Sequence, residues 1–222
     1  MPNKNKKIFS LLDKIIDIEE IVVPKEYKQI WNDVSLATQK RKAKNYDLSE
    51  EQTNKALQQL CKRPYYLTTI AEIFNVNSIA EVGTAEGLQF FSFARYVKNK
   101  NGHVWSCDIK DVRNKEYCEI YKNNTTFCLG DSKNLSSKID TKIDLFYIDG
   151  AHGYGDVVRD VVNLKEKQSE NPIWIFDDFD IRFGCYKDIE RLCNMGKPHK
   201  VYRVGNTASG YPNHQVIIQG KF

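Results

Sequence analysis

Three aspartates that follow apolar segments are the residues of this chain best placed to do chemistry. Asp149 follows the apolar run 145–148, and Asp177 and Asp178 follow the apolar run 173–176. If these runs are neighbouring parallel strands, their ends lie about 5 Å apart and the three carboxylates converge. Carboxylates this close repel each other, and a hard divalent cation such as Mg²⁺ relieves the repulsion. We therefore predict a metal site formed by Asp149, Asp177 and Asp178.

A histidine accompanies the first of these acids. His152 lies three residues after Asp149, in the segment Asp-Gly-Ala-His. Imidazole titrates near neutral pH, so a histidine beside a metal and an open pocket suits the role of general base. The alternative is a loop histidine whose ring bonds only to its neighbours. We favour the catalytic role for His152 and interpret the histidines at 103, 199 and 214 as structural, with His214 also a candidate substrate contact.

A glycine turn earlier in the chain predicts a nucleotide-binding crevice. The apolar run 79–82 contains Glu81 and is followed by Gly83, Thr84 and Gly87, after which an amphipathic segment begins. This order of strand, turn and helix builds ligand crevices at the carboxyl edge of parallel sheets. The two glycines are four residues apart, unlike the Gly-x-Gly-x-x-Gly pattern of dinucleotide sites. The Glu81 carboxylate would repel a pyrophosphate and suits a ligand with a cationic amino-acid end.

Two further acids follow strand-like runs. Asp108 ends the run 103–108 and lies 21 residues after Gly87, where a carboxylate can accept hydrogen bonds from both hydroxyls of a ribose. The alternative for Asp108 is a cap on the next helix. Asp131 follows the run 125–129, in a Gly-Asp-Ser segment that is also typical of a simple turn.

Strands and helices alternate over most of the chain. Strand-like runs at 79–83, 103–108, 125–129, 143–148 and 172–177 are separated or followed by helical runs at 86–98, 114–123, 153–168 and 186–195. Such alternation predicts parallel strands joined by right-handed crossovers. The runs 200–204 and 215–219 have only a loop between them, which indicates an antiparallel hairpin. We predict an α/β, Rossmann-like, doubly wound, mostly parallel seven-stranded sheet with an antiparallel C-terminal hairpin, preceded by N-terminal helices.

The N-terminal third has a different pattern. Residues 1–75 are predicted to form a helical segment that serves as a lid or an oligomer contact, and residues 76–222 the ligand-binding domain. We expect helices at 25–42, from a capping box at Ser49 and Gln52 to about Leu60, and at 65–75, with Pro64 between the last two. The apolar stripe at 8–16 is itself helical and is a candidate surface for a homodimer.

Composition limits the partners and the compartment. The net charge of +4 is too small to require nucleic acid, and the basic run 40–44 is interpreted as a solvated helix face. The six cysteines form no zinc-ligand spacing, which favours a reducing, cytoplasmic compartment. We find neither a signal-peptide core nor a run near the ~20 apolar residues that span a bilayer, so no membrane association is expected.

Together these residues resemble the class I S-adenosylmethionine-dependent methyltransferases, and among them the metal-dependent antibiotic-sugar O-methyltransferases of the macrocin and mycinamicin type. The resemblance covers residues 78–220. It implies that the cofactor S-adenosylmethionine is bound by a set of residues that comprises Glu81, Gly83, Thr84, Gly87, Asp108, Asp131 and Asp149. It also implies Mg²⁺ or another divalent cation at Asp149, Asp177 and Asp178, with His152 and Asp149 as catalytic residues. Asp131 would approach the adenine amino group.

The implied reaction is direct methyl transfer to a hydroxyl of a small molecule, such as a sugar. The metal would hold the hydroxyl, His152 would remove its proton, and the alkoxide would attack the sulfonium methyl. One departure from the family is Ala85, where many methyltransferases carry glycine. Alanine can serve there if the backbone avoids positive φ.

Two enzyme classes compete with this interpretation. A nicotinamide oxidoreductase would use the glycine turn but has no evident use for the three aspartates. A metal-dependent glycosyltransferase would use the aspartates to bind a nucleotide sugar but leaves Glu81 and Asp108 without a role. A nucleic-acid methyltransferase would need a basic, aromatic-rich groove, which the scattered aromatic residues do not predict.

Overall fold

A seven-stranded sheet forms the centre of the molecule in the computed structural model, which describes residues 18–222. Its strands lie in the order β3-β2-β1-β4-β5-β7-β6. β1 to β5 are parallel, and β7 is antiparallel to both of its neighbours, which confirms the predicted sheet and hairpin. The strands are β1 (Ser78–Val82), β2 (His103–Asp108), β3 (Thr125–Leu129), β4 (Ile143–Ile148), β5 (Gln168–Phe176), β6 (His199–Asn206) and β7 (Pro212–Gln219).

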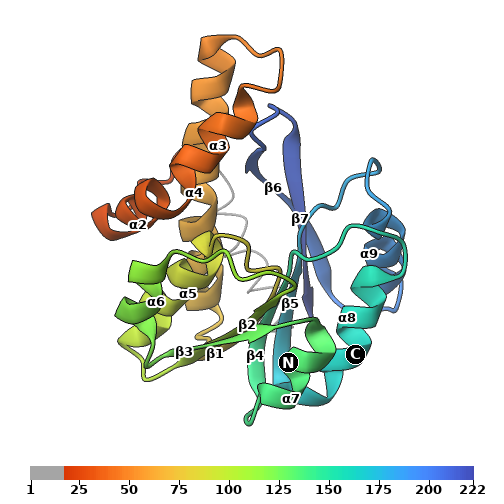
Figure 1. Ribbon diagram of the computed structural model, residues 1–222. Coiled ribbons are helices and arrows are strands. Elements are labelled where there is room, and N and C mark those ends of the chain that lie inside the picture. Colours follow the sequence, from red (N-terminus) through yellow and green to blue (C-terminus); the bar gives the residue numbers. More distant parts are fainter. Residues whose placement is uncertain (1–17) are drawn as a thin grey trace.

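Both faces of the sheet are buried, because strands with near-continuous apolar residues need cover on two sides. One face carries residues such as Ile79 and Leu145 and packs against α4 (Glu50–Ile73) and α5 (Leu88–Lys98). The other face carries residues such as Phe146 and Trp174 and packs against α7 (Ser132–Lys138), α8 (Asp156–Leu164) and α9 (Cys185–Cys193). α6 (Lys115–Tyr121) lies beside α5 on the first face (Figure 1). A 3₁₀ turn, Lys165–Lys167, leads from α8 into β5.

Helix α4 corrects one prediction. We expected Pro64 to separate two helices, but α4 runs unbroken from Glu50 to Ile73 with Pro64 inside it. Proline removes one backbone hydrogen bond, yet the residues after it, among them Leu67 and Ile70, are fully buried in the core. This burial offsets the lost bond. The predicted capping box at Ser49 and Gln52 is confirmed.

The N-terminal helices stand over the carboxyl ends of the strands (Figure 1). α2 (Lys25–Ile30), a π-helical turn (Trp31–Ser35) and α3 (Leu36–Ala43) follow one another without a break, which confirms the predicted helical stretch at 25–42. Ile30 and Val34 belong to the same buried cluster as α4, α5 and the first face of the sheet. The helices therefore pack onto the sheet domain through a shared core. The predicted stripe at 8–16 lies outside the described residues.

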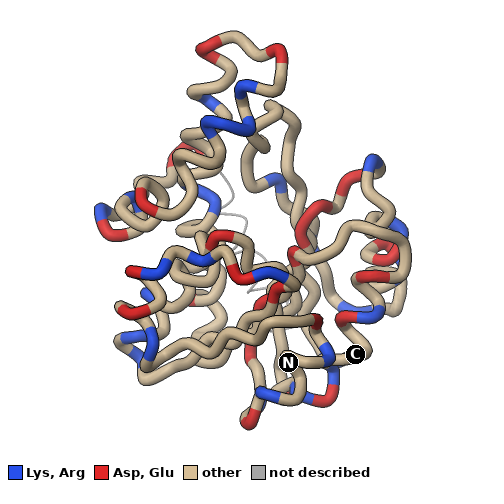
Figure 2. The backbone as a smooth tube through the Cα atoms, viewed as in Figure 1, with Lys and Arg blue, Asp and Glu red and all other residues tan. Residues whose placement is uncertain are grey.

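The charges of the described chain are mixed in sign, with basic residues gathered on α3 (Figure 2). Helices long and apolar enough to cross a membrane are absent from residues 18–222.

Candidate active site

The turn between β1 and α5 brings two strand ends into direct contact. Gly83 has φ +94°, and a Cβ atom there would lie 2.0 Å from the carbonyl oxygen of Asp149 at the end of β4. Only glycine permits both this backbone conformation and this approach. Gly87, the residue directly before α5, also has a left-handed backbone conformation, with φ +96°.

Ala85 does not meet the condition under which alanine can readily replace glycine. Its φ is +45°, so alanine occupies the left-handed region at this position. The side chain of Asp108 accounts for this conformation, because its Oδ2 accepts a 2.8 Å hydrogen bond from the Ala85 backbone N–H. The turn is thus held from the end of β2.

Glu81 lies at the floor of a cavity beside this turn. The residue is only 1% exposed, and Ser106 donates a 2.6 Å hydrogen bond to its Oε2. Its other oxygen, Oε1, has no hydrogen-bond partner among the described residues. Burial disfavours the charged form and raises the pKa of Glu81 to about 8. A donor group entering the cavity would find this oxygen free.

The cavity measures about 210 Å³ and extends from the strand ends to the N-terminal helices. Its lower wall includes Glu81, Gly83 and Gln89, and Thr84 and Asp149 also line it. The upper wall comes from segments to which sequence reasoning assigned no site residue, and it includes Trp31, Gln39, Lys42, Leu60 and Arg63.

Asp108 and Asp131 sit where the sequence placed them, and both bond to backbone groups. Asp108 accepts from Ala85 through one oxygen and from the Lys110 backbone N–H through the other, at 3.1 Å. Asp131 caps α7 in a reciprocal capping box with Asn134. Their roles toward ribose and adenine stay predictions.

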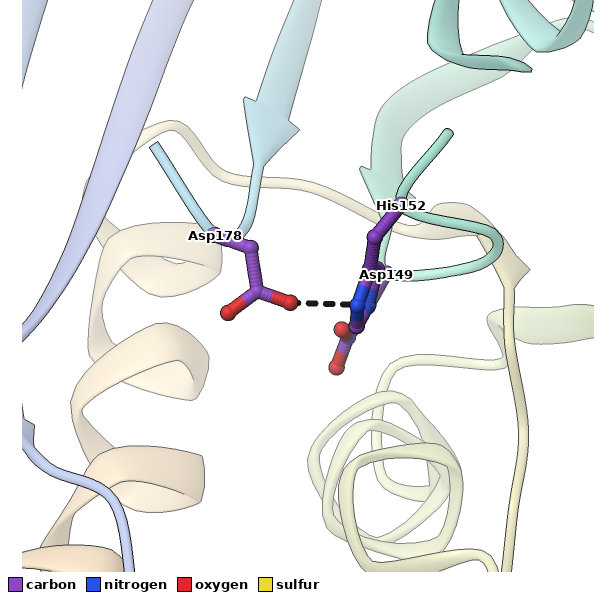
Figure 3. Close-up of side chains that lie close together, drawn as sticks. All are labelled: Asp149, His152 and Asp178. Atoms are coloured by element: carbon purple, nitrogen blue, oxygen red, sulfur yellow. Dashed lines mark ion pairs between the residues drawn. The ribbon is translucent and has the colours of Figure 1, made fainter. Parts of the chain in front are cut away.

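Three of the predicted catalytic and metal residues meet in one place (Figure 3). Asp149 and His152 follow β4, and Asp178 follows β5. One potential ligand atom from each lies within 4.8 Å of the other two, and His152 Nε2 is 2.8 Å from Asp178 Oδ2. This hydrogen bond raises the pKa of His152 from its usual value. Two carboxylates and an imidazole are suitable donors for a divalent cation.

Asp177 turns away from this group. Its Oδ2 accepts hydrogen bonds from Arg63 and, at 2.7 Å, from the hydroxyl of Tyr147. The backbone at Asp178 has φ +54°, and this reversal directs two consecutive acids to different partners. Burial acts to raise the pKa of Asp177, but the Arg63 guanidinium and the hydrogen bonds from Tyr147 and the Asp178 backbone together outweigh it and hold this pKa below its usual range. The place of Asp177 among the metal ligands stays a prediction.

Arg63 is the functional candidate that sequence reasoning missed. It lies on the same face of α4 as Tyr66, Leu67 and Ile70, which are all buried in the core. Arg63 precedes Tyr66 by three positions and Leu67 by four, so it continues the apolar stripe with a charged residue. This charge on a buried face is the signal that could have identified it. Its Nη2 is 2.6 Å from the Tyr147 hydroxyl and 3.1 Å from Asp149 Oδ2.

Comparison with known proteins agrees with this geometry. Residues 80–179 match the sequence profile of a family described as "Methyltransferase domain". A search of curated protein sequences gave no match. The matched segment 80–179 includes both the glycine turn and the cluster of Asp149, His152 and Asp178.

Several solved structures share the fold over nearly the whole chain. A Klebsiella pneumoniae protein assigned as an O-methyltransferase has a TM-score of 0.61 at 12% identity, covering 98% of this chain and 100% of its own. The O-methyltransferase from Bacillus cereus in complex with SAH has a TM-score of 0.58 at 13% identity, covering 96% and 100%. TomG from Streptomyces achromogenes, an O-methyltransferase involved in tomaymycin synthesis, was solved with SAM and has a TM-score of 0.58 at 13% identity, covering 90% and 92%.

At these identities the structural likeness concerns the fold, while the family match concerns the segment that carries the site. The chain therefore has the fold of these methyltransferases, and residues 80–179 match the family described as "Methyltransferase domain".

Proposed function

We propose that this protein is an S-adenosylmethionine-dependent O-methyltransferase that methylates a hydroxyl of a small molecule with the help of a divalent cation, Mg²⁺ or a similar ion. The observation that carries the proposal is the position of Asp149. Its backbone contacts Gly83 in the glycine turn, while its carboxylate belongs to the cluster with His152 and Asp178. The cavity beside the glycine turn and the acidic cluster therefore share a residue.

The cavity fits the amino-acid end of S-adenosylmethionine. The free Oε1 of Glu81 can accept a hydrogen bond from a ligand ammonium group. The side-chain amide of Gln89, 8% exposed and also without a partner among residues 18–222, lies in the same wall and can bond to a carboxylate. The Bacillus and Streptomyces proteins of the same fold were solved with SAH and SAM. Bound S-adenosylmethionine supplies an electrophilic methyl group.

The cluster fits a hard divalent cation. Mg²⁺ in enzymes is commonly bound by one or two carboxylates and several waters, and Asp149 and Asp178 provide two carboxylates. Such an ion lowers the pKa of a hydroxyl bound beside it. His152 is then available to accept the hydroxyl proton, and its hydrogen bond to Asp178 holds the ring in place.

The acceptor we propose is a polyhydroxylated molecule such as a sugar. The polar β6–β7 loop reaches the segment that follows Asp178, since Tyr211 packs on the Arg182 guanidinium at 4.1 Å. The hydroxyls of Thr207 and Ser209 in that loop, 2.6 Å apart, offer hydrogen bonds to hydroxyl groups of an acceptor.

Glu81→Gln should reveal the buried carboxyl through its effect on stability and binding. The folded pKa of about 8 lies above the ordinary value of 4.5, so the protonated carboxyl stabilises the fold below about pH 4.5, and this contribution is lost as pH rises to 8. Glutamine stays neutral at every pH, so the variant does not suffer this loss. The free energy of unfolding of the variant minus that of the parent should therefore increase between pH 5 and pH 8.5, as measured by denaturant unfolding. S-Adenosylhomocysteine should then stabilise the parent more than the variant at pH 8.5. A stability difference that does not change with pH would contradict the assignment.

The proposed function is tested by calorimetric titration of the full chain. We expect S-adenosylhomocysteine to bind with or without Mg²⁺ and NAD⁺ to give no response. Methyl transfer to sugar and catechol acceptors should then depend on added Mg²⁺ and cease with a chelator. Binding of NAD⁺ or of a nucleotide sugar, with no response to S-adenosylhomocysteine, would replace the methyltransferase by one of the competing enzyme classes.

A further inference from the structure

The side chain of Arg63 reaches the carboxyl ends of the strands from a helix outside residues 80–179, the segment that matches the methyltransferase family. It comes from the middle of α4, and its side chain is only 17% exposed. There it meets three acceptors, the carboxylates of Asp149 and Asp177 and the hydroxyl of Tyr147. A guanidinium this buried is stable only beside such partners, and its pKa is raised well above the usual value by Asp177 in particular, against the effect of burial.

Both oxygens of Asp177 are occupied within the protein. Oδ2 accepts from Arg63 and Tyr147, and Oδ1 accepts a 2.8 Å hydrogen bond from the backbone N–H of Asp178. The residue is 3% exposed. In contrast, the bonds that Asp149 accepts from Arg63 and Tyr147 both fall on Oδ2, and Asp178 is directed toward His152.

The charges of the site balance only when Arg63 is included. The acids at 149, 177 and 178 carry three negative charges if all are ionised. Arg63 supplies one positive charge and a divalent cation two, which makes the sum zero with His152 neutral. Buried charges without compensation are costly, so this balance defines what the site can hold.

We propose that Arg63 is a positioning residue that acts as a fixed internal cation: it holds Asp177 away from metal coordination and so limits the site to one divalent cation bound by Asp149 and Asp178. The inference rests on the proposed function, because it concerns the metal of that site. It assigns Asp177 to the protein's own ion-pair network.

The test measures Mn²⁺ binding to the full chain by calorimetry, without acceptor and without turnover. Arg63→Met should tighten Mn²⁺ binding on the order of tenfold, because affinity rises with the number of uncompensated ligand charges. The double variant Arg63→Met with Asp177→Asn removes one charge of each sign and should bind Mn²⁺ like the parent. Lys62→Met, one position away on α4, is the matched control for loss of a positive charge, because Lys62 bonds outside the cluster, to the Glu19 carbonyl at 2.7 Å. It should leave Mn²⁺ affinity unchanged.

The double variant decides the question even if Arg63→Met fails to fold. If Asp177 is a metal ligand, the double variant loses Mn²⁺ affinity while the parent binds, and the inference is overturned with the proposed function intact. An unchanged affinity in a folded Arg63→Met also overturns it. If the parent does not bind Mn²⁺, the metal part of the proposed function fails. In that case, binding of Mn²⁺ by Arg63→Met still supports the role of Arg63. Absence of Mn²⁺ binding in every variant overturns the role of Arg63 as well.

Discussion

His152→Ala is expected to reduce methyl transfer about 10²–10⁴-fold, the usual contribution of a positioned general base. The ring bonds to Asp178 and lies beside Asp149, while Glu81 and the glycine turn after β1 line the cavity, whose lining residues do not include His152. Binding of S-adenosylhomocysteine should therefore be unchanged, and Mn²⁺ should still bind, because both carboxylates remain. Single-turnover rates and calorimetric titrations of the same preparation measure the three quantities.

The matched control is His199→Ala, which removes an exposed histidine at the start of β6. It should methylate at the parent rate. Turnover of His152→Ala at the parent rate would remove the base assignment. Loss of Mn²⁺ binding together with turnover would instead make His152 a metal ligand.

Gly83→Ala should abolish cofactor binding and destabilise the fold strongly. The new Cβ would stand 2.0 Å from the Asp149 carbonyl oxygen, a backbone atom that cannot move without displacing the end of β4. The positive φ alone costs about 1–2 kcal/mol for a residue with a side chain. The steric conflict adds to that cost and shifts Asp149 out of its cluster. Denaturant unfolding and S-adenosylhomocysteine titration measure both effects.

Gly196→Ala separates the two causes. Gly196 has φ +76° and open space around its Cβ position, so this variant carries the conformational cost without the conflict. It should lose about 1–2 kcal/mol of stability and bind the cofactor normally. Equal losses in the two variants, with binding retained in both, would show that the contact between the β1 turn and Asp149 is not close.

The sheet could be predicted from the sequence because its strands are apolar on both faces. The predicted bounds of β2, β3 and β4 agree with the structure. Helix α7 was not predicted, since it has seven residues and buries only Ser132 and Leu135, too few for a helical apolar pattern. The continuity of α4 through Pro64 depends on packing with the sheet, which no local pattern reports.

The site could be predicted in part for a related reason. Acids at strand ends are visible in the sequence, and the parallel sheet brings Asp149 and Asp178 together. The partner of Asp177 was not predictable, because Arg63 is 114 residues away and belongs to a helix without a catalytic or ligand-binding motif. The positive φ of Asp178, which directs the two adjacent acids to different partners, could not be predicted either, because no glycine stands at that position.

The contact of Gly83 with the Asp149 backbone has an energetic consequence. A ligand that presses on the β1 turn also moves the residue that carries a carboxylate of the acidic cluster. For the cofactor and cation that we propose, the two affinities are then thermodynamically linked: the factor by which one ligand changes the affinity of the other is the same in both directions. A chain that joined the two places through a longer, compliant segment could fill them independently, whereas the direct contact in this fold couples them.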